Sequence, residues 1–308
     1  PDETSCRIYD LDPVTGTVNI FADLNRDDVP FVDGVFFDPT GTYAFLANRA
    51  LTPQLTVLRR PEDVDAAVAR ARAAGVVAVD TETDSLTPSS AKLVGVSLAL
   101  EPGAACYIPL GHVAPSSISG GLDLGGAEEH PVQVPLEEAV ALLKPLLQDP
   151  AVLKVGHNLK FDAQVFAQHG IDLGPVDDTM LISYVLDGGA HGHGMDELAE
   201  RHLGHQTIKF SDVAGSGKAQ VTFDRVPLDR ACAYAAEDAD ITLRLHRALK
   251  PRLLAQRLVT VYETIERPLV PVVAAMERTG VRLDRAVLAR MSRAFAERLA
   301  ELEAGIHK

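Results

Sequence analysis

Cysteine is scarce in this sequence of 308 residues, and its three cysteines lie far apart. Cys6, Cys106 and Cys232 are odd in number and show no CxxC spacing. Neither a disulfide framework nor a cysteine-based zinc site is therefore indicated. We expect these cysteines to serve as small apolar residues in a protein of a reducing compartment.

Long hydrophobic runs are also lacking. The sequence contains no stretch of about eighteen uncharged apolar residues, and it does not begin with a basic segment followed by an apolar one. We therefore expect neither a membrane span nor a signal peptide. Because the first residue is Pro1, we expect the chain to be a fragment of a longer protein.

Positive charge is in deficit, with 29 Lys and Arg against 43 Asp and Glu and a formal net charge of −14 at pH 7. A broad electrostatic grip on duplex DNA usually needs a basic face, so the composition argues against one. A small site that holds a few nucleotides through bound cations and base stacking is still compatible with it. The local candidates for phosphate contact are Lys154, Lys160, Lys209 and Lys218, most of which we expect to be ordinary surface lysines.

Acidic residues gather in three separated segments. VVAVDTETDSL holds Asp80 and Glu82, VGHNLKFD holds Asp162, and YAAEDAD holds Tyr234 and Asp238. Carboxylates can bind an anionic phosphodiester only through cations, and hard cations such as Mg²⁺ prefer oxygen ligands. Two such ions about 3.5–4 Å apart activate the attacking water and stabilise the departing oxygen. The set therefore predicts a two-metal nuclease site.

The first acidic pair follows a predicted strand. Residues 76–79 are β-branched or apolar, and the period of two along a strand puts Asp80 and Glu82 on one face of its end. Taken alone, Asp80 also fits a cap or a solvated loop residue.

The other two segments are predicted helices. Asn158 is a good cap residue after an apolar run, and it stands four residues before Asp162, so the two share a helix face. Tyr234 and Asp238 have the same spacing within an alanine-rich stretch over 227–254. Singly, Asp162 also fits a surface position and Tyr234 a partly buried core aromatic. The joint occurrence of all three segments in this order favours the metal site.

DTETDSL, KVGHNLKFD and YAAEDADIT resemble the three exonuclease motifs of bacterial DNA polymerase I (family A), in the tyrosine-containing subclass of the DEDD 3′–5′ exonucleases. The similarity covers roughly residues 52–308. It implies an α/β fold of the ribonuclease H-like type, a mixed sheet flanked by helices. It also implies that Asp80, Glu82, Asp162 and Asp238 are metal ligands and that Tyr234 positions or activates the water.

The same resemblance implies a set of DNA-binding residues. Leu86 would wedge against the terminal bases, while Asn158 and Phe210 would contact the single-stranded end. His157 stands where a glutamine is common in the family and belongs to this set, and the segment around Gly192 lacks the expected basic residue. The implied cofactors are two divalent metal ions, Mg²⁺ first, with Mn²⁺ or Zn²⁺ as alternatives.

The function implied by the resemblance is proofreading. A metal-dependent 3′–5′ exodeoxyribonuclease would hydrolyse the terminal phosphodiester of single-stranded or frayed DNA and release nucleoside monophosphates. Its implied partners are a single-stranded DNA 3′ end and a polymerase domain in cis in the full-length parent. We expect a monomer in the bacterial cytoplasm, near the nucleoid. Two alternatives stay open: an RNA-trimming exonuclease of the same superfamily, and a catalytically silent structural domain of a polymerase.

Residues 1–50 differ in pattern from the rest. IYDLDPVTGTVNIFADL and GVFFDPTGTYAFLANR are β-rich runs interrupted by DP and TG turn pairs, which predicts two hairpins. They resemble one blade of a regucalcin or gluconolactonase-type β-propeller. Because a propeller needs several blades to close its ring, we expect a segment foreign to the rest of the chain. A genuine accessory β element is the alternative.

Residues 51–257 form the predicted exonuclease domain. Strands are expected in LTVLRR, VVAVDTET, KLVGVSLAL, ACYIPL and VLKVG, and helices over 61–74 and in PLEEAVALLKPLLQ. Residues 258–308 are predicted to be helical and resemble the first thumb helices of a polymerase domain, with Pro268 and Pro271 expected to interrupt or kink the helix. We expect no polymerase active site in this fragment.

Three further motifs carry weaker signals. His191 and His193 could suggest a transition metal, but with no third histidine or cysteine nearby we expect loop residues. GSGK at 215–218 lacks the full phosphate-loop pattern and follows no buried strand. SSISGGLDLGGAEEH is an expected surface loop.

Overall fold

The computed structural model describes residues 54–113 and 131–306 with their side chains, and the backbone of four strands in the first fifty residues. The chain divides into two compact units, Pro1–Pro53 and Gln54–Lys308. The predicted surface loop SSISGGLDLGGAEEH and the side chain of Cys6 lie outside the described residues. Cys106 and Cys232 are buried and free, as expected of small apolar residues.

The first unit holds two antiparallel strand pairs. β1 (Ser5–Leu11) pairs with β2 (Val18–Asn25), and β3 (Gly34–Phe37) pairs with β4 (Ala44–Ala47). The predicted β-rich N-terminal segment with two hairpins is therefore confirmed. Its foreign origin stays a prediction.

The second unit is built on one six-stranded mixed sheet with the order β10-β9-β6-β7-β8-β5. The strands are β5 (Gln54–Val57), β6 (Val76–Thr83), β7 (Leu93–Glu101), β8 (Ala104–Pro109), β9 (Leu153–Gly156) and β10 (Val176–Asp178). β7 is antiparallel to both of its neighbours, and the other pairings are parallel. This sheet and its flanking helices confirm the predicted α/β class.

Helices occupy most of the remaining described chain. They are α1 (Pro61–Ala74), α2 (Leu136–Leu147), α3 (Leu159–Gln168), α4 (Thr179–Asp187), α5 (Met195–Leu203), α6 (Phe210–Ala214), η1 (Gly217–Ala219), η2 (Phe223–Arg225), α7 (Leu228–Ala255), α8 (Val259–Val261), the π-helical η3 (Tyr262–Glu266), α9 (Arg267–Thr279) and α10 (Arg285–Ile306). The GSGK segment lies around η1, after a helix and not after a strand, so the phosphate-loop pattern is not realised. None of the helices in the described ranges combines the length and the apolarity needed to cross a bilayer.

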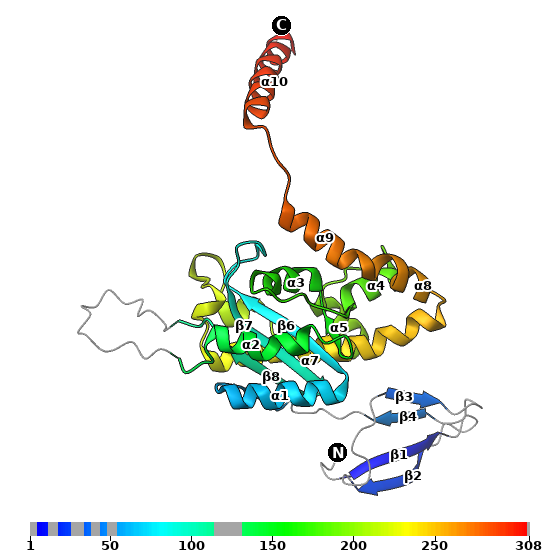
Figure 1. Cartoon of the computed structure of the whole chain (residues 1–308). Helices are drawn as coiled ribbons and strands as arrows, with labels where there is room; N and C mark the ends of the chain where they lie inside the picture. Colours follow the sequence, from blue (N-terminus) through cyan, green and yellow to red (C-terminus); the bar gives the residue numbers. More distant parts are fainter. Residues whose placement is uncertain are drawn as a thin grey trace. The chain divides into compact units, whose positions relative to one another are not determined.

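The sheet is covered on both faces (Figure 1). Val77 and Val79 of β6 join a core with α1, α2 and α3, whereas Ala78 between them joins a core with α7. The α7 face of the second core is lined by small, fully buried residues, Ala231, Ala235, Ala236 and Ala239. Because alanine lets a helix approach a sheet closely, α7 packs directly over β6, β7 and β8.

Two local signals fix α1 where the sequence predicts it. Pro61 stands at the first helical position, where its missing N–H costs nothing, and Gly75 ends the helix with a φ of 72°. A Cβ-bearing residue at Gly75 would be strained in this left-handed conformation. The helix delivers the chain into β6, the strand that carries the first acidic pair.

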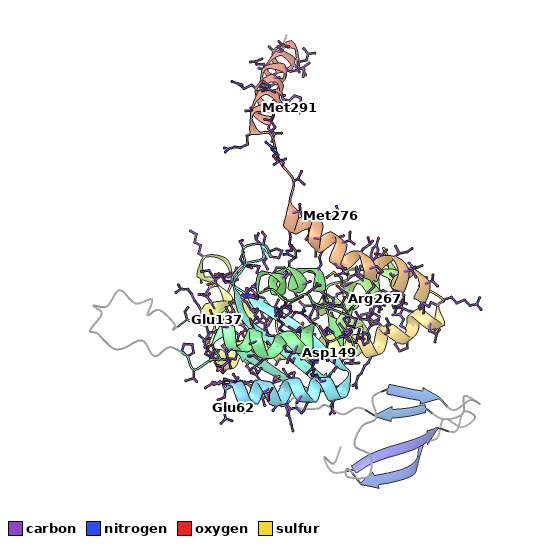
Figure 2. The ribbon with its side chains drawn as sticks, in the orientation of Figure 1. Glu62, Glu137, Asp149, Arg267, Met276 and Met291 are labelled. Carbon is purple, nitrogen blue, oxygen red and sulfur yellow. The ribbon has the colours of Figure 1, made fainter. Side chains whose placement is uncertain are left out.

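The C-terminal extension is helical, as predicted. The backbone is π-helical over Tyr262–Glu266 and continues directly into α9 (Arg267–Thr279), so the hydrogen-bond pattern changes beside Pro268 but the helix does not end there, and Pro271 lies inside α9 without ending it. Figure 2 labels Met276 on α9 and Met291 on α10, and both are exposed together with most apolar residues around them. All residues of α10 are exposed.

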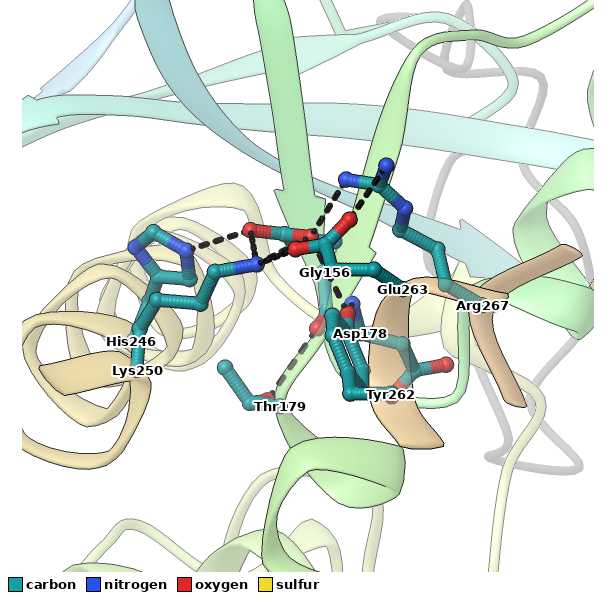
Figure 3. Close-up of polar contacts among 9 residues, drawn as sticks. Gly156, Asp178, Thr179, His246, Lys250, Tyr262, Glu263 and Arg267 are labelled. Carbon is teal, nitrogen blue, oxygen red and sulfur yellow. Dashed lines mark hydrogen bonds and ion pairs between the residues drawn. The ribbon is translucent and has the colours of Figure 1, made fainter. Parts of the chain in front are cut away.

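A buried ionic network ties this extension to the sheet (Figure 3). Asp177 of β10 is 1% exposed and accepts hydrogen bonds from His246 Nε2 at 2.8 Å, Lys250 Nζ at 3.1 Å and the Tyr262 hydroxyl at 3.1 Å. Arg267 of α9 lies 3.4 Å from the same carboxylate. Burial raises the pKa of Asp177, but the bonds from His246 and Lys250 outweigh it and lower this pKa to about 2.

Asp177→Asn is expected to lower the free energy of unfolding by about 1.5–3 kcal/mol, because it removes the charge that accepts from half-buried His246 and Lys250, and Glu263 is then the remaining counter-charge of Lys250 and Arg267. Urea denaturation measures the change, with Asp172→Asn at an exposed position as the control, expected within about 0.5 kcal/mol of the parent. Since the folded pKa of Asp177 lies below the ordinary 3.8, its contribution is present above about pH 4 and is lost as the pH falls through about 2. Equal stability of the two variants would contradict this account.

Candidate active site

Three carboxylates from two elements meet at the end of β6. Asp80 and Glu82 share one strand face with Ala78, which packs against α7, and α7 supplies Asp238. Ligand oxygens of the three residues lie within 4.8 Å of one another. Glu82 and Asp238 are each 8% exposed, and Asp80 is half-buried. The strand alternation and the i,i+4 spacing thus bring the first and third acidic segments together.

Asp162 of α3 lies beside these three carboxylates and is hydrogen-bonded to Thr81. Its Oδ1 accepts hydrogen bonds from Thr81 N at 3.0 Å and from Thr81 Oγ1 at 2.5 Å. Asp162 is 3% exposed, and its charge raises the pKa of both Asp80 and Glu82. Thr81 was not among the predicted site residues. The sequence signal for Thr81 is its position between Asp80 and Glu82. Because side chains alternate along a strand, Thr81 points to the opposite face of β6, where it donates to Asp162.

The start of α3 corrects one prediction. The helix begins at Leu159, but Asn158 has a φ of 64° and makes no side-chain cap. The carboxylate of Asp178 accepts from the N–H of Asn158 at 3.1 Å and of Leu159 at 2.8 Å, and it also caps α4 by accepting from Met180 N at 2.9 Å. Asparagine tolerates the left-handed conformation better than most residues. In this conformation the side chain of Asn158 is exposed beside the site.

Crowding and burial raise the pKa values of the acids. Burial raises the pKa of Asp80, Glu82 and Asp238 well above the ordinary range, and neighbouring carboxylates raise each of them further. Burial also raises the pKa of Asp162 to about 7, against hydrogen bonds from Thr81 that lower it. Glu82 Oε1 is buried without a hydrogen-bond partner in the described part of the chain. An all-oxygen donor set with an unpartnered oxygen fits hard divalent cations.

These pKa values predict how the stability of the cation-free protein depends on pH. The folded pKa of Asp162 lies above its ordinary 3.8, so its protonated form stabilises the fold below about pH 4, and this contribution is lost as the pH rises through about 7. We therefore expect the stabilisation by added Mg²⁺ to grow over this pH range. Thermal unfolding with chelator and with Mg²⁺ measures it. Asp162→Asn should reduce the pH dependence of the stabilisation by Mg²⁺. Asp65→Asn, at an exposed position of α1, should leave this pH dependence unchanged. A pH-independent effect of Mg²⁺ in the parent would contradict the assignment.

Tyr234 lies one helical turn before Asp238, and its hydroxyl is hydrogen-bonded to that carboxylate. Burial, and then the charges of Asp238 and Glu82, raise the pKa of Tyr234 above its ordinary value of 10. The phenol therefore stays protonated at neutral pH and acts as a hydrogen-bond donor. Its ring contacts Phe210 and Phe223 at centroid distances of 6.1 and 5.8 Å.

The four predicted DNA-binding residues are on or near the surface. Leu86 lies in the loop after β6 and is 92% exposed, and Phe210, 38% exposed, adjoins Tyr234. Asn158 is exposed, whereas His157 is half-buried with its Nδ1 2.9 Å from Thr179 Oγ1. The structure thus places Phe210 against a site residue and Asn158 one turn before Asp162. Their contact with DNA stays a prediction.

The lysine candidates divide. Lys154 is fully buried and donates to the backbone oxygens of Asp149, Val152 and Gly174 at 2.5–2.8 Å, so the prediction of a phosphate contact is wrong for this residue. Burial lowers its pKa to about 8. Lys160 pairs with Glu277 of α9 at 2.5 Å. Lys209 and Lys218 are exposed.

Glu237 is a second site-supporting residue that the motifs did not identify. It accepts a hydrogen bond from His205 Nε2 at 2.8 Å and another from Ile208 N at 2.6 Å. These bonds anchor the segment that leads into Phe210 to the helix that carries Asp238. The only sequence signal for Glu237 was that it directly precedes Asp238. That position is equally compatible with the solvated face of a helix.

Comparison with known proteins agrees with this geometry. A family model described as a 3′–5′ exonuclease matches residues 56–254. The chain therefore belongs to the 3′–5′ exonuclease family, which confirms the predicted enzyme class.

Bacterial polymerases are among the similar curated proteins. DNA polymerase I of Rhizobium leguminosarum is 50% identical over 253 residues, which cover 79% of this chain and 24% of that protein. DNA polymerase I of Pseudomonas aeruginosa is 44% identical over 243 residues, 78% of this chain and 25% of that protein. The chain thus spans about a quarter of the length of these relatives. The POL domain of Pol1 from M. smegmatis, solved in complex with DNA primer-template and dNTP, has a TM-score of 0.60 at 20% identity, over 80% of this chain and 36% of that one, which shows a shared fold.

Proposed function

We propose that this chain removes nucleotides hydrolytically from the 3′ end of single-stranded or frayed DNA, as the proofreading part of a DNA polymerase I-like protein. The observation that carries the proposal is the meeting of Asp80, Glu82 and Asp238 within 4.8 Å, with Asp162 and Tyr234 beside them. Membership of the 3′–5′ exonuclease family supports degradation from the 3′ end of the strand. The similarity to full-length polymerases supports a polymerase domain in cis.

The four acids would hold two divalent metal ions, Mg²⁺ first, with Mn²⁺ or Zn²⁺ as alternatives. Such ions supply Lewis-acid activation of water and stabilisation of the leaving oxygen. The chain itself contributes the convergence of the carboxylates, with Asp162 oriented by Thr81. Tyr234, protonated and hydrogen-bonded to Asp238, would position the attacking water by donating a hydrogen bond.

The exposed residues around the acids would hold the strand end. Phe210 offers a ring face for base stacking, which is worth about 1–3 kcal/mol per base and tolerates any sequence. Leu86, 92% exposed, would wedge against the terminal bases, and Asn158 and His157 would contact the nucleotides that follow. This grip needs no basic face, which agrees with a net charge of −14. We propose a monomer acting in the bacterial cytoplasm on the chromosome.

A single assay tests the proposal. The purified chain is incubated with a 5′-labelled single-stranded DNA, with the same strand blocked at its 3′ end, and with an RNA of the same sequence. Stepwise shortening of the free DNA with Mg²⁺, release of nucleoside monophosphates, and loss of both with chelator are expected. Faster shortening of the RNA would favour the RNA-trimming alternative, and no cleavage of either strand would favour a silent structural domain.

A further inference from the structure

A second group of ligand-type side chains lies outside the carboxylate site. Asp187 at the end of α4, His191 in the following turn and His202 near the end of α5 bring one ligand atom each within 4.8 Å of one another. We call these three residues the histidine cluster. The sequence-based expectation that no third histidine accompanies His191 is therefore wrong, because α5 folds His202 back onto the turn.

His191 is oriented as a metal-binding imidazole would be. Its Nδ1 lies 2.5 Å from the carbonyl oxygen of Gly192, and a carbonyl can only accept, so Nδ1 carries the proton. In the neutral ring this leaves the lone pair on Nε2, which faces Asp187 Oδ2 at 3.8 Å. The side chain is 5% exposed. A hydrogen bond that fixes the tautomer and aims the other nitrogen is the usual support of a metal-ligating histidine.

His202 contributes an unpartnered nitrogen. Its Nε2 is buried and has no hydrogen-bond partner among the described residues, which is costly for a polar atom unless something else binds it. The rings of His191 and His202 have centroids 6.3 Å apart.

Asp187 supplies an oxygen held by a third element. Arg252 of α7 donates from Nη2 to Asp187 Oδ1 at 3.0 Å and to Oδ2 at 2.9 Å. A carboxylate has about four lone-pair directions, so this contact orients the group and leaves acceptor capacity toward the two imidazoles. The cluster thus offers two imidazole nitrogens and one carboxylate oxygen on a framework of α4, α5 and α7.

We propose that the histidine cluster binds one Zn²⁺ ion through His191, His202 and Asp187, with water completing a tetrahedral site. Two imidazoles and one carboxylate form a common zinc donor set, whereas Mg²⁺ and Ca²⁺ prefer oxygen alone. The site differs in this respect from the all-oxygen carboxylate group of the nuclease. The ion would fasten the turn over residues 188–194 to α5.

The turn over residues 188–194 and α5 are both packed against elements near the carboxylate site. His193 in the same turn has its Nδ1 2.9 Å from Ser183 Oγ, and its ring packs against His191 and Tyr184 at centroid distances of 5.1 and 5.6 Å. α5 packs against α7, the helix that carries Asp238. A zinc ion at the cluster would therefore fix a helix that supports α7, without touching the carboxylates.

The test compares zinc binding by four forms of the full chain. Chelator-treated parent, His191→Ala, His202→Ala and His169→Ala are dialysed against equal Zn²⁺ in excess Mg²⁺, and bound zinc is counted. His169 follows α3 and lies outside the cluster. The parent and His169→Ala should hold one more equivalent than the two cluster variants, or bind it at least about 10-fold more tightly. Equal zinc in all four forms would overturn the proposal.

Two further measurements separate the histidine cluster from the carboxylate site. Replacement of zinc by Co²⁺ in the parent should give the visible absorption of a nitrogen-ligated tetrahedral ion, and its absence would overturn the proposal even if a histidine variant failed to fold. Asp238→Ala should keep the extra zinc equivalent, and its loss there would assign the ion to the carboxylate site. Mg²⁺-dependent shortening of DNA by folded His191→Ala should equal that of the parent, so a failure of zinc binding and a failure of nuclease function can be told apart.

Discussion

Asp80→Ala is expected to lower the rate of nucleotide release by about 10³-fold or more while the protein stays folded. Loss of one carboxylate from the proposed two-ion site would remove several kcal/mol of transition-state stabilisation, and each 1.36 kcal/mol corresponds to a factor of ten. Asp80 lies at the end of β6 and is half-buried, and its carboxylate is surrounded by other acids. Its removal therefore costs little packing. We expect the same outcome for Asp162→Ala.

Cleavage of a 5′-labelled single strand at saturating Mg²⁺ measures this loss. Asp65→Ala, the same chemical change on the exposed face of α1, is the control and should retain the parent rate. Because crowded carboxylates repel one another without cations, Asp80→Ala should melt at the same temperature as the chelator-treated parent or higher. Turnover at the parent rate by Asp80→Ala with Mg²⁺ would remove the basis of the two-ion assignment.

The sequence was sufficient where a local pattern determined the outcome. The apolar run over 76–79 predicted β6, and its period of two placed Asp80 and Glu82 on the face that meets α7. The predicted helix over 61–74 agrees with α1 residue for residue, because Pro61 and Gly75 mark its ends. Within the site, the i,i+4 spacing put Tyr234 and Asp238 in contact.

The sequence was insufficient where a contact joins distant segments. Nothing in the order of residues indicated that Asp178 would cap α3 in place of Asn158, because the bond spans 20 residues and depends on β9 and β10 lying side by side. The sequence around Lys154 does not distinguish it from a surface lysine. Its burial depends on a contact with the backbone oxygen of Gly174, 20 residues further along the chain. His202 joined His191 only through the packing of α4 and α5, which no spacing rule anticipates.

The second large effect separates Tyr234 from the acid one turn beyond it. Tyr234→Phe removes a hydroxyl that is hydrogen-bonded to Asp238 and protonated at neutral pH. Its loss is expected to slow cleavage up to the range of about 10²–10⁴-fold that is typical of a positioned proton-handling group. The carboxylates remain, so the Mg²⁺ concentration at half-maximal rate should not change. Asp238→Ala removes one of the three converging acids, so it should raise that Mg²⁺ concentration and lower the rate further.

A Mg²⁺ titration of the cleavage rate distinguishes the two residues, with Tyr184→Phe as the matched control. Tyr184 is 53% exposed on α4 and contacts His193, so loss of its hydroxyl should leave both the maximal rate and the Mg²⁺ dependence unchanged. If excess Mg²⁺ restores the rate of Tyr234→Phe, the hydroxyl contributes to cation binding and not to positioning the water. If Tyr234→Phe cleaves at the parent rate throughout the titration, the hydroxyl has no part in the reaction, and the carboxylates alone carry it.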